Sequence, residues 1–181
     1  MRVISGKKKG MNLLGTKDKF TRPTEDRIKE AIFDSLYNIT EGSNVLDLFA
    51  GTGSIGIEFL SRGAKFSAFC DKSRININCI KENLKHTDFL NQAKLYHGEN
   101  ERNLFNLKSD GIKFDYIFID PPYDHINLYY DSLKFIKENS LLRKDGIIIV
   151  ESHEKLNIKD YDIIKTKKYG KKIVYFLNLG E

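Results

Sequence analysis

Apolar residues along the chain follow two alternating patterns, short runs rich in apolar residues and positions spaced three or four apart. The runs are typical of buried strands, and they lie at 45–49, 66–70, 93–96, 114–119 and 146–150. The helical spacing covers 24–38, 55–60, 75–84 and 128–137. Strands that alternate with helices predict an α/β fold with a mostly parallel sheet covered on both faces.

The C-terminal end of the chain departs from this alternation. Two further strand-like segments, 161–165 and 173–179, are separated only by a short turn around Gly170. Parallel neighbours need a long crossover connection, so a turn of this length joins antiparallel strands. The last strand is therefore predicted to run antiparallel to the others.

The N-terminal 22 residues are predicted to form a separate unit. The segments 2–5 and 11–14 are strand-like and flank Gly6 and Gly10, which suit a hairpin turn. A hairpin of this size cannot bury enough surface to be stable alone, so it must pack on the rest of the chain or on a ligand. The expected organisation is an arm at 1–22 and a main domain at 23–181.

The charge of the chain is unevenly distributed. A length of 181 residues fits one domain, and an apolar content of 40% excludes a disordered protein. The net charge of +5 divides into +6 at residues 1–22, +5 at residues 165–172 and −6 over the remainder. Two basic regions on an otherwise acidic chain suggest a polyanionic partner, although solvated lysine-rich segments have the same composition.

The sequence shows no signal for export or membrane insertion. No apolar stretch approaches the ~18 residues of a membrane-spanning helix, and the lysine-rich start lacks the apolar core of a signal peptide. The two cysteines, Cys70 and Cys79, do not have the spacing of metal ligands. These features predict a cytoplasmic protein that uses no metal ion.

Three predicted strands end in residues suited to a ligand, and α/β sheets bind ligands at the carboxyl ends of their strands. The first runs from Asp47 into a turn with Gly51 and Gly53, which either admits a ligand close to the backbone or simply connects strand to helix. The turn lacks the lysine of a phosphate-binding loop, and Asp47 favours a cationic ligand. The second strand ends near Asp71, which can accept the hydrogens of a ribose diol or cap the next helix.

The third strand ends in Asp120-Pro121-Pro122-Tyr123, the most distinctive motif of the chain. The prolines fix the backbone and supply no N–H donors, which leaves the Asp120 carboxylate and the Pro121 carbonyl as acceptors. Acceptors beside the aromatic face of Tyr123 suit a planar base with an exocyclic amino group. A turn that is merely rigid would need neither the acid nor the aromatic ring.

Together these motifs resemble those of the S-adenosylmethionine-dependent amino-group methyltransferases. The segments Arg2-Val-Ile-Ser-Gly6, Arg22-Pro-Thr24 and Tyr169-Gly-Lys-Lys-Ile-Val-Tyr175-Phe further resemble the RsmD family, which methylates the exocyclic N2 of a guanine in bacterial 16S ribosomal RNA. The resemblance covers nearly the whole chain. It implies a Rossmann-like methyltransferase fold, with a seven-stranded sheet in the order 3-2-1-4-5-7-6 and strand 7 antiparallel.

The resemblance also implies roles for individual residues. The residues expected to bind S-adenosylmethionine are Asp47, Phe49, Gly51, Gly53, Asp71, Glu99 and Asn100. The residues expected to hold the target guanine are Asp120, Pro121, Pro122 and Tyr123. The residues of the arm expected to bind RNA are Arg2, Lys7, Lys8, Lys9, Lys19, Arg22 and Thr24. One segment departs from the family pattern, because Gly98-Glu99-Asn100 stands where relatives usually have Gly-Asp-Ala.

The partner implied by the resemblance is 16S ribosomal RNA within the small ribosomal subunit, with guanine 966 as the family target. A monomer is expected. A second, weaker RNA contact is expected at the basic turn, defined as Lys167, Lys168, Lys171 and Lys172. Two alternatives stay open: an adenine-N6 methyltransferase of DNA or RNA, which shares the Asp-Pro-Pro-Tyr motif, and a non-catalytic RNA-binding assembly factor.

Overall fold

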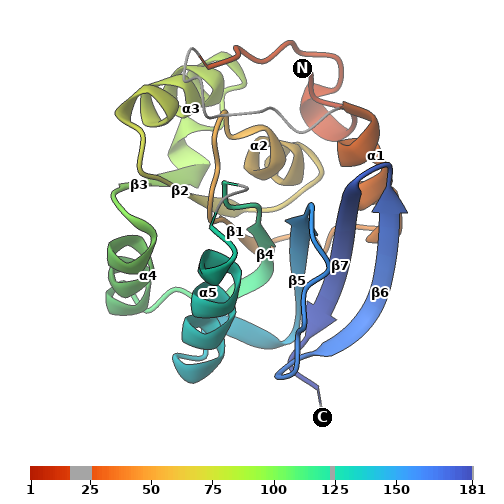
Figure 1. Ribbon diagram of the computed structural model, residues 1–181. Helices are drawn as coiled ribbons and strands as arrows, with labels where there is room; N and C mark the ends of the chain where they lie inside the picture. The colour runs from red at the N-terminus through yellow and green to blue at the C-terminus, as the bar shows by residue number, and fades with distance from the viewer. Residues whose placement is uncertain (17–25, 123–124, 181) are drawn as a thin grey trace.

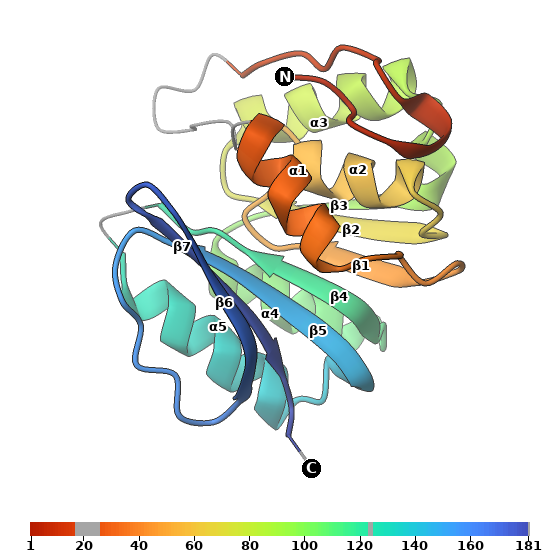
Figure 2. The same ribbon diagram turned by 90° about the vertical axis from the view of Figure 1, so that its right-hand side faces the viewer.

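The computed structural model describes residues 1–16, 26–122 and 125–180 (Figures 1 and 2). A seven-stranded sheet in the order β3-β2-β1-β4-β5-β7-β6 runs through the middle of the molecule. The strands are β1 Asn44–Asp47, β2 Phe66–Asp71, β3 Ala93–His97, β4 Phe114–Ile119, β5 Leu142–Ser152, β6 Asp162–Tyr169 and β7 Lys172–Asn178. This order confirms the predicted fold.

The directions of the strands also agree with the prediction. The pairs β2–β3, β1–β2, β1–β4 and β4–β5 are parallel, whereas β7 runs antiparallel to both β5 and β6. Asp47 pairs with Phe69 of β2 on one side and with Phe118 of β4 on the other. The strand order reverses at β1 and β4, which is where sheets of this kind bind ligands.

Helices cover both faces of the sheet. Figure 2 shows α1, α2 and α3 on one face and α4 and α5 on the other. The helices are α1 Asp26–Ser35, α2 Ser54–Ser61, α3 Arg74–His86, α4 Asn100–Ser109 and α5 Asn127–Glu138, with short 3-10 turns at Gly6–Lys8 and Leu90–Gln92. None of the helices in the described part of the chain is both long and apolar enough to cross a membrane.

An apolar core lies between each face of the sheet and the helices that pack on it. Alternate residues of β4 supply both, because successive side chains of a strand point to opposite faces. Tyr116 and Phe118 belong to the core under α1, α2 and α3, whereas Ile117 and Ile119 belong to the core under α4 and α5. All four side chains are buried.

Helix α4 was not predicted from the apolar pattern. Only Leu104, Phe105 and Leu107 are large and apolar in this helix, and Phe105 is exposed to solvent. Asn103 occupies a third buried position where an apolar residue would have marked the helix. The amphipathic signal was therefore too short to separate this segment from a loop.

The N-terminal segment, residues 1–16, packs on the main domain and pairs with itself in antiparallel fashion, as predicted. The pairing is short: Arg2 and Asn12 form one antiparallel bridge, Val3 donates its N–H to the Met11 carbonyl at 2.9 Å, and a 3-10 turn at Gly6–Lys8 takes the place of a simple hairpin turn. Backbone N–H groups of this segment donate to side chains of α2 as well as to carbonyls of the segment itself. The Glu58 carboxylate, for example, accepts from the N–H groups of Ile4 and Ser5 at 2.8 and 3.0 Å.

Strand β6 forms one edge of the sheet, opposite β3, and among the described strands it pairs with β7 alone. Most of β6 lies at the surface, including Ile163 and Ile164. The strand also carries Lys165, Lys167 and Lys168.

Candidate active site

Three acidic residues lie at the carboxyl ends of neighbouring strands. Asp47 is the last residue of β1, Asp71 is the last residue of β2, and Asp120 directly follows β4. Because β2, β1 and β4 are adjacent and parallel, these acids share one edge of the sheet. Acceptors gathered in this way suit a ligand that carries positive charge and N–H donors.

Asp47 is almost completely buried. One carboxylate oxygen accepts the backbone N–H of Gly56 at 3.0 Å, in the first turn of α2. Burial raises the pKa of Asp47 to about 7, the Gly56 hydrogen bond lowers it in part, and the nearby Asp71 adds to the rise. A cation bound beside this carboxylate would stabilise its ionised form.

The turn between β1 and α2 requires glycine. Gly51 and Gly53 have φ angles of 55° and 77°, which side chains disfavour. A Cβ atom on Gly53 would also lie 3.2 Å from the side chain of Ile80. Phe49, at the start of the turn, is half-buried and packs against the core under α4 and α5. The backbone of the turn therefore forms a tight, defined loop next to Asp47.

Asp71 holds the local structure together in addition to any role toward a ligand. Its carboxylate accepts the N–H of Gly51 at 2.9 Å and the N–H of Ser73 at 2.8 Å. The side-chain amide of Asn76 donates to both carboxylate oxygens at 3.2 Å. The cap of α3 is Ser73, whose hydroxyl oxygen accepts the N–H of Asn76, so Asp71 stabilises the turn before the helix without capping it; contact with ribose stays a prediction.

Glu99 and Asn100 follow β3 and differ in their surroundings. Glu99 is exposed and directly precedes α4. The side-chain amide of Asn100 donates to the hydroxyl of Ser132 in α5 at 3.0 Å, and its Oδ1 is buried without a hydrogen-bond partner among the described residues. Asn100 therefore joins α4 to α5 and leaves one acceptor for a ligand.

The Asp120-Pro121-Pro122 turn leaves the sheet beside β1. Asp120 is half-buried, Pro121 is buried and Pro122 is exposed. The Pro122 carbonyl accepts the N–H of His125 at 3.2 Å, which closes the turn ahead of α5. Tyr123, the expected stacking residue, lies outside the described residues.

Two residues that the sequence analysis did not connect with the Asp-Pro-Pro-Tyr motif, Glu151 and Lys172, lie close to Asp120. Val150 of β5 pairs with Ile119 of β4, so the next residues along, Glu151 and Asp120, are neighbours on adjacent strands. Glu151 is fully buried, one of its oxygens is ion-paired with the ammonium of Lys172, and the other has no hydrogen-bond partner in the described part of the chain. Burial raises the pKa of Asp120, and so does the negative charge of Glu151. The positive charge of Lys172 lowers this pKa, whereas the negative charge of Asp47 raises it further.

The basic turn therefore differs from its prediction in one residue. Lys172 was expected to contact RNA from the surface, but its side chain is only 14% exposed and its ammonium lies on Glu151. Lys171, next to it, is exposed. No sequence signal distinguished the two lysines, because β-strand alternation alone does not fix which one faces inward.

The expected RNA-binding residues of the arm lie on the surface where the structure describes them. Arg2, Lys7 and Lys9 are exposed and Lys8 is half-buried, with its ammonium 5.8 Å from the ring centre of Phe89. The remaining three, Lys19, Arg22 and Thr24, lie outside the described residues.

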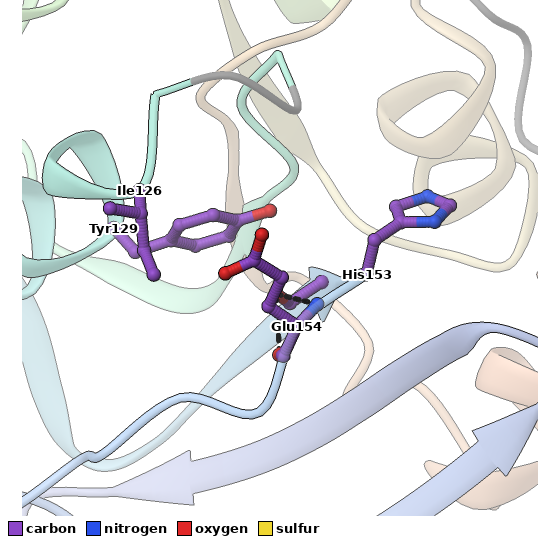
Figure 3. A pocket seen from close by; sticks show the side chains of 5 residues that line it. Ile126, Tyr129, His153 and Glu154 are labelled. Carbon is purple, nitrogen blue, oxygen red and sulfur yellow. Dashed lines mark hydrogen bonds between the residues drawn. The ribbon is translucent and has the colours of Figure 1, made fainter.

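A small cavity lies beside the end of β5 (Figure 3). Tyr129 and Glu154 approach each other across it, whereas the His153 ring points away from Tyr129. The cavity measures about 10 Å³, which admits about one water molecule. It is too small for a cofactor. The better candidate site is the edge of the sheet where Asp47, Asp71 and Asp120 stand at the ends of β1, β2 and β4, called the ligand-binding edge below. Among the described residues, no group of three His, Cys, Asp or Glu side chains is placed to bind a metal ion.

Comparison with known proteins identifies the family of the chain. Residues 1–178 match the family described as Conserved hypothetical protein 95. A relative from Bacillus subtilis, "Putative rRNA methyltransferase YlbH", is 38% identical over 94% of this chain and 94% of its own. "Ribosomal RNA small subunit methyltransferase D" from Haemophilus influenzae is 30% identical over 94% of this chain and 89% of its own.

A solved structure shows the same fold over the whole length of the chain. It is a methyltransferase-titled protein from Escherichia coli that superposes with a TM-score of 0.83 at 24% identity, covering 99% of this chain and 98% of that one. Family match, relatives and fold agree with the motifs at the strand ends. The chain belongs to the Conserved hypothetical protein 95 family, which is the RsmD family that its sequence resembles.

Proposed function

We propose that this protein transfers a methyl group from S-adenosylmethionine to the exocyclic N2 of a guanine in 16S ribosomal RNA of the small subunit. The observation that carries the proposal is the position of Asp120, Pro121 and Pro122 directly beyond β4, next to the buried Asp47. The names of the relatives support an rRNA methyltransferase. Guanine 966 is the target that the family resemblance implies, and a cytoplasmic place of action is part of the same proposal.

The ligand-binding edge fits S-adenosylmethionine, whose donors and positive charge meet acceptors there. Asp47 would hold the amino group, and the turn with Gly51 and Gly53 would lie along the methionine part. Asp71 would accept the ribose hydroxyls while it keeps its hydrogen bond to Gly51. Glu99 and the free oxygen of Asn100 would face the adenine amino group. When bound, the cofactor would supply an electrophilic methyl group whose bond to sulfur breaks as its bond to N2 forms; the leaving group is neutral S-adenosylhomocysteine, and the methylated nitrogen then releases one proton.

Asp120 and Pro121 would prepare the guanine nitrogen for attack. This nitrogen is a poor nucleophile because its lone pair is delocalised into the ring. The Asp120 carboxylate and the Pro121 carbonyl would accept its two hydrogens, which favours a pyramidal nitrogen with a localised lone pair. Preorganised acceptors of this kind lower a barrier by about 3 kcal/mol each. Tyr123 would stack on the base once it has left its own stack.

RNA would be held by the basic regions on the surface. Lys7, Lys8 and Lys9 of the arm can neutralise backbone phosphates, and Lys167, Lys168 and Lys171 would add a second, weaker contact. The buried Lys172 takes no part in this contact.

Asp120 accepts a hydrogen of the target nitrogen most strongly when its carboxylate is ionised, so its charged neighbours should set the pH dependence of the reaction. Its pKa is raised, so activity is expected to fall on acidification at a higher pH than an ordinary carboxylate would give. Lys172→Met removes the nearby positive charge and should move the acid limb to higher pH. Glu151→Gln removes the negative charge and should move it to lower pH.

The measurement is the pH profile of single-turnover methyl transfer for both variants, with the exposed Lys171→Met as the matched control. Circular dichroism at each pH excludes loss of structure as the cause. Acid limbs that coincide with that of the wild type in both variants would contradict this role of the pair.

The proposed reaction is tested by incubating the protein with methyl-labelled S-adenosylmethionine and, separately, with small ribosomal subunits, naked 16S rRNA and duplex DNA. We expect label in the ribosomal RNA, recovered as N2-methylguanosine after digestion. Label found only in DNA, or recovered as N6-methyladenosine, would overturn the proposal in favour of an adenine methyltransferase. Bound RNA with no label in any substrate would favour a non-catalytic assembly factor.

A further inference from the structure

Two buried asparagines lie on one face of α3. Asn76 and Asn83 are seven residues apart, or about two helical turns, so their side chains point the same way. They are 3% and 0% exposed. Figure 2 shows the N-terminal segment running along this helix, although the two are far apart in sequence. Each asparagine contacts both the N-terminal segment and the ligand-binding edge.

Asn83 connects the N-terminal segment to the glycine turn. Its side-chain amide donates to the carbonyl of Thr52, between Gly51 and Gly53, at 3.0 Å. The same amide donates to the carbonyl of Leu14 at 3.1 Å, and its oxygen accepts the N–H of Leu14 at 2.7 Å. One side chain thus holds Leu14 by two hydrogen bonds and the glycine turn by a third.

Asn76 makes the same kind of connection to Asp71. Its amide donates to the Asp71 carboxylate at 3.2 Å, and its oxygen accepts the hydroxyl hydrogen of Thr16 at 2.7 Å. Helix packing alone does not call for polar groups here, since Ile80 and Leu84 of the same helix are buried in the apolar core. The side-chain oxygens of Asn76 and Asn83 both accept hydrogen bonds from the N-terminal segment, and their amide groups both donate to the ligand-binding edge.

We propose that Asn76 and Asn83 are positioning residues that couple the N-terminal segment to the cofactor-binding turns. Through them, binding of the cofactor would stabilise the position of the N-terminal segment, which is part of the RNA-binding arm. A segment held in this position would in turn increase the affinity for the cofactor. The coupling is reciprocal, as any linkage between two binding events must be. This inference rests on the proposed function only in taking S-adenosylmethionine as the ligand.

The first test measures the affinity for S-adenosylhomocysteine by calorimetry. Thr16→Val removes the hydroxyl that donates to Asn76 and lies outside the ligand-binding edge. It should weaken binding about three- to tenfold, the range of a single hydrogen bond. The matched control is Asn78→Ala, on the exposed side of α3, which should bind like the wild type.

The second test measures hydrogen exchange of the full chain with and without S-adenosylhomocysteine. Saturation should slow exchange of the Leu14 amide, which donates to Asn83. In Asn83→Ala, the added protection at Leu14 should disappear at saturating ligand. Unchanged affinity in Thr16→Val together with unchanged exchange at residues 11–16 would overturn the coupling. Failure of the wild type to bind the ligand would instead refute the proposed function.

Discussion

Replacing Asp120 with alanine is expected to reduce methyl transfer by about 10²–10³-fold, while binding of S-adenosylhomocysteine is retained. The change removes the acceptor that would localise the lone pair of the target nitrogen. It should not unfold the protein, because Asp120 lies next to the buried Glu151 and its charge is already disfavoured there. Single-turnover transfer to small ribosomal subunits and calorimetric binding separate the two effects.

A matched control for this variant is Asp145→Ala, at an exposed position of β5. It removes the same functional group away from the ligand-binding edge and should leave transfer unchanged. Full activity in Asp120→Ala would show that the mechanism proposed for this residue is wrong.

Replacing Glu58 with alanine is expected to lower the free energy of unfolding by about 3–5 kcal/mol. Glu58 and Lys29 are both fully buried, with 3.5 Å between their charged atoms. Without the carboxylate, Lys29 would remain as an uncompensated buried charge, and the N–H groups of Ile4 and Ser5 would lose their acceptor. Burial already lowers the pKa of Lys29, which Glu58 counteracts.

Urea unfolding followed by circular dichroism measures this loss. The control is Glu82→Ala, which breaks the ion pair with Lys85 on the surface of α3 and should cost less than about 1 kcal/mol. Equal losses in the two variants would mean that the buried pair contributes no more than an exposed one. Amide hydrogen exchange of Glu58→Ala locates the effect: a larger loss of protection from exchange at residues 1–14 than elsewhere would place it in the N-terminal segment.

The sheet could be predicted from the sequence because its strands are short runs rich in apolar residues. Five of its strands and the reversed last strand follow from these runs and from the short turn at Gly170. Helix α4 could not be predicted, since Asn103 occupies one of its few inward positions. The antiparallel pairing within the arm was predictable, but its attachment to Glu58 through the N–H groups of Ile4 and Ser5 was not, because Glu58 is distant in sequence.

The candidate site was predictable where its residues directly follow strands. Asp47, Asp71 and Asp120 could be found in this way, since strand ends can be located in sequence. Glu151 and Lys172 could not, because their importance depends on the register between β4, β5 and β7, which links residues far apart in the chain. Asn76 and Asn83 were hidden for a similar reason, because they contact the N-terminal segment across the fold.

The position of β6 has a consequence for how copies of this protein meet. An edge strand offers unpaired backbone groups to which another strand can add, and exposed Ile163 and Ile164 would make such addition more favourable. Lys165, Lys167 and Lys168 place positive charges along the same strand. Two such edges would repel each other, so these lysines would disfavour edge-to-edge aggregation of the protein free of RNA.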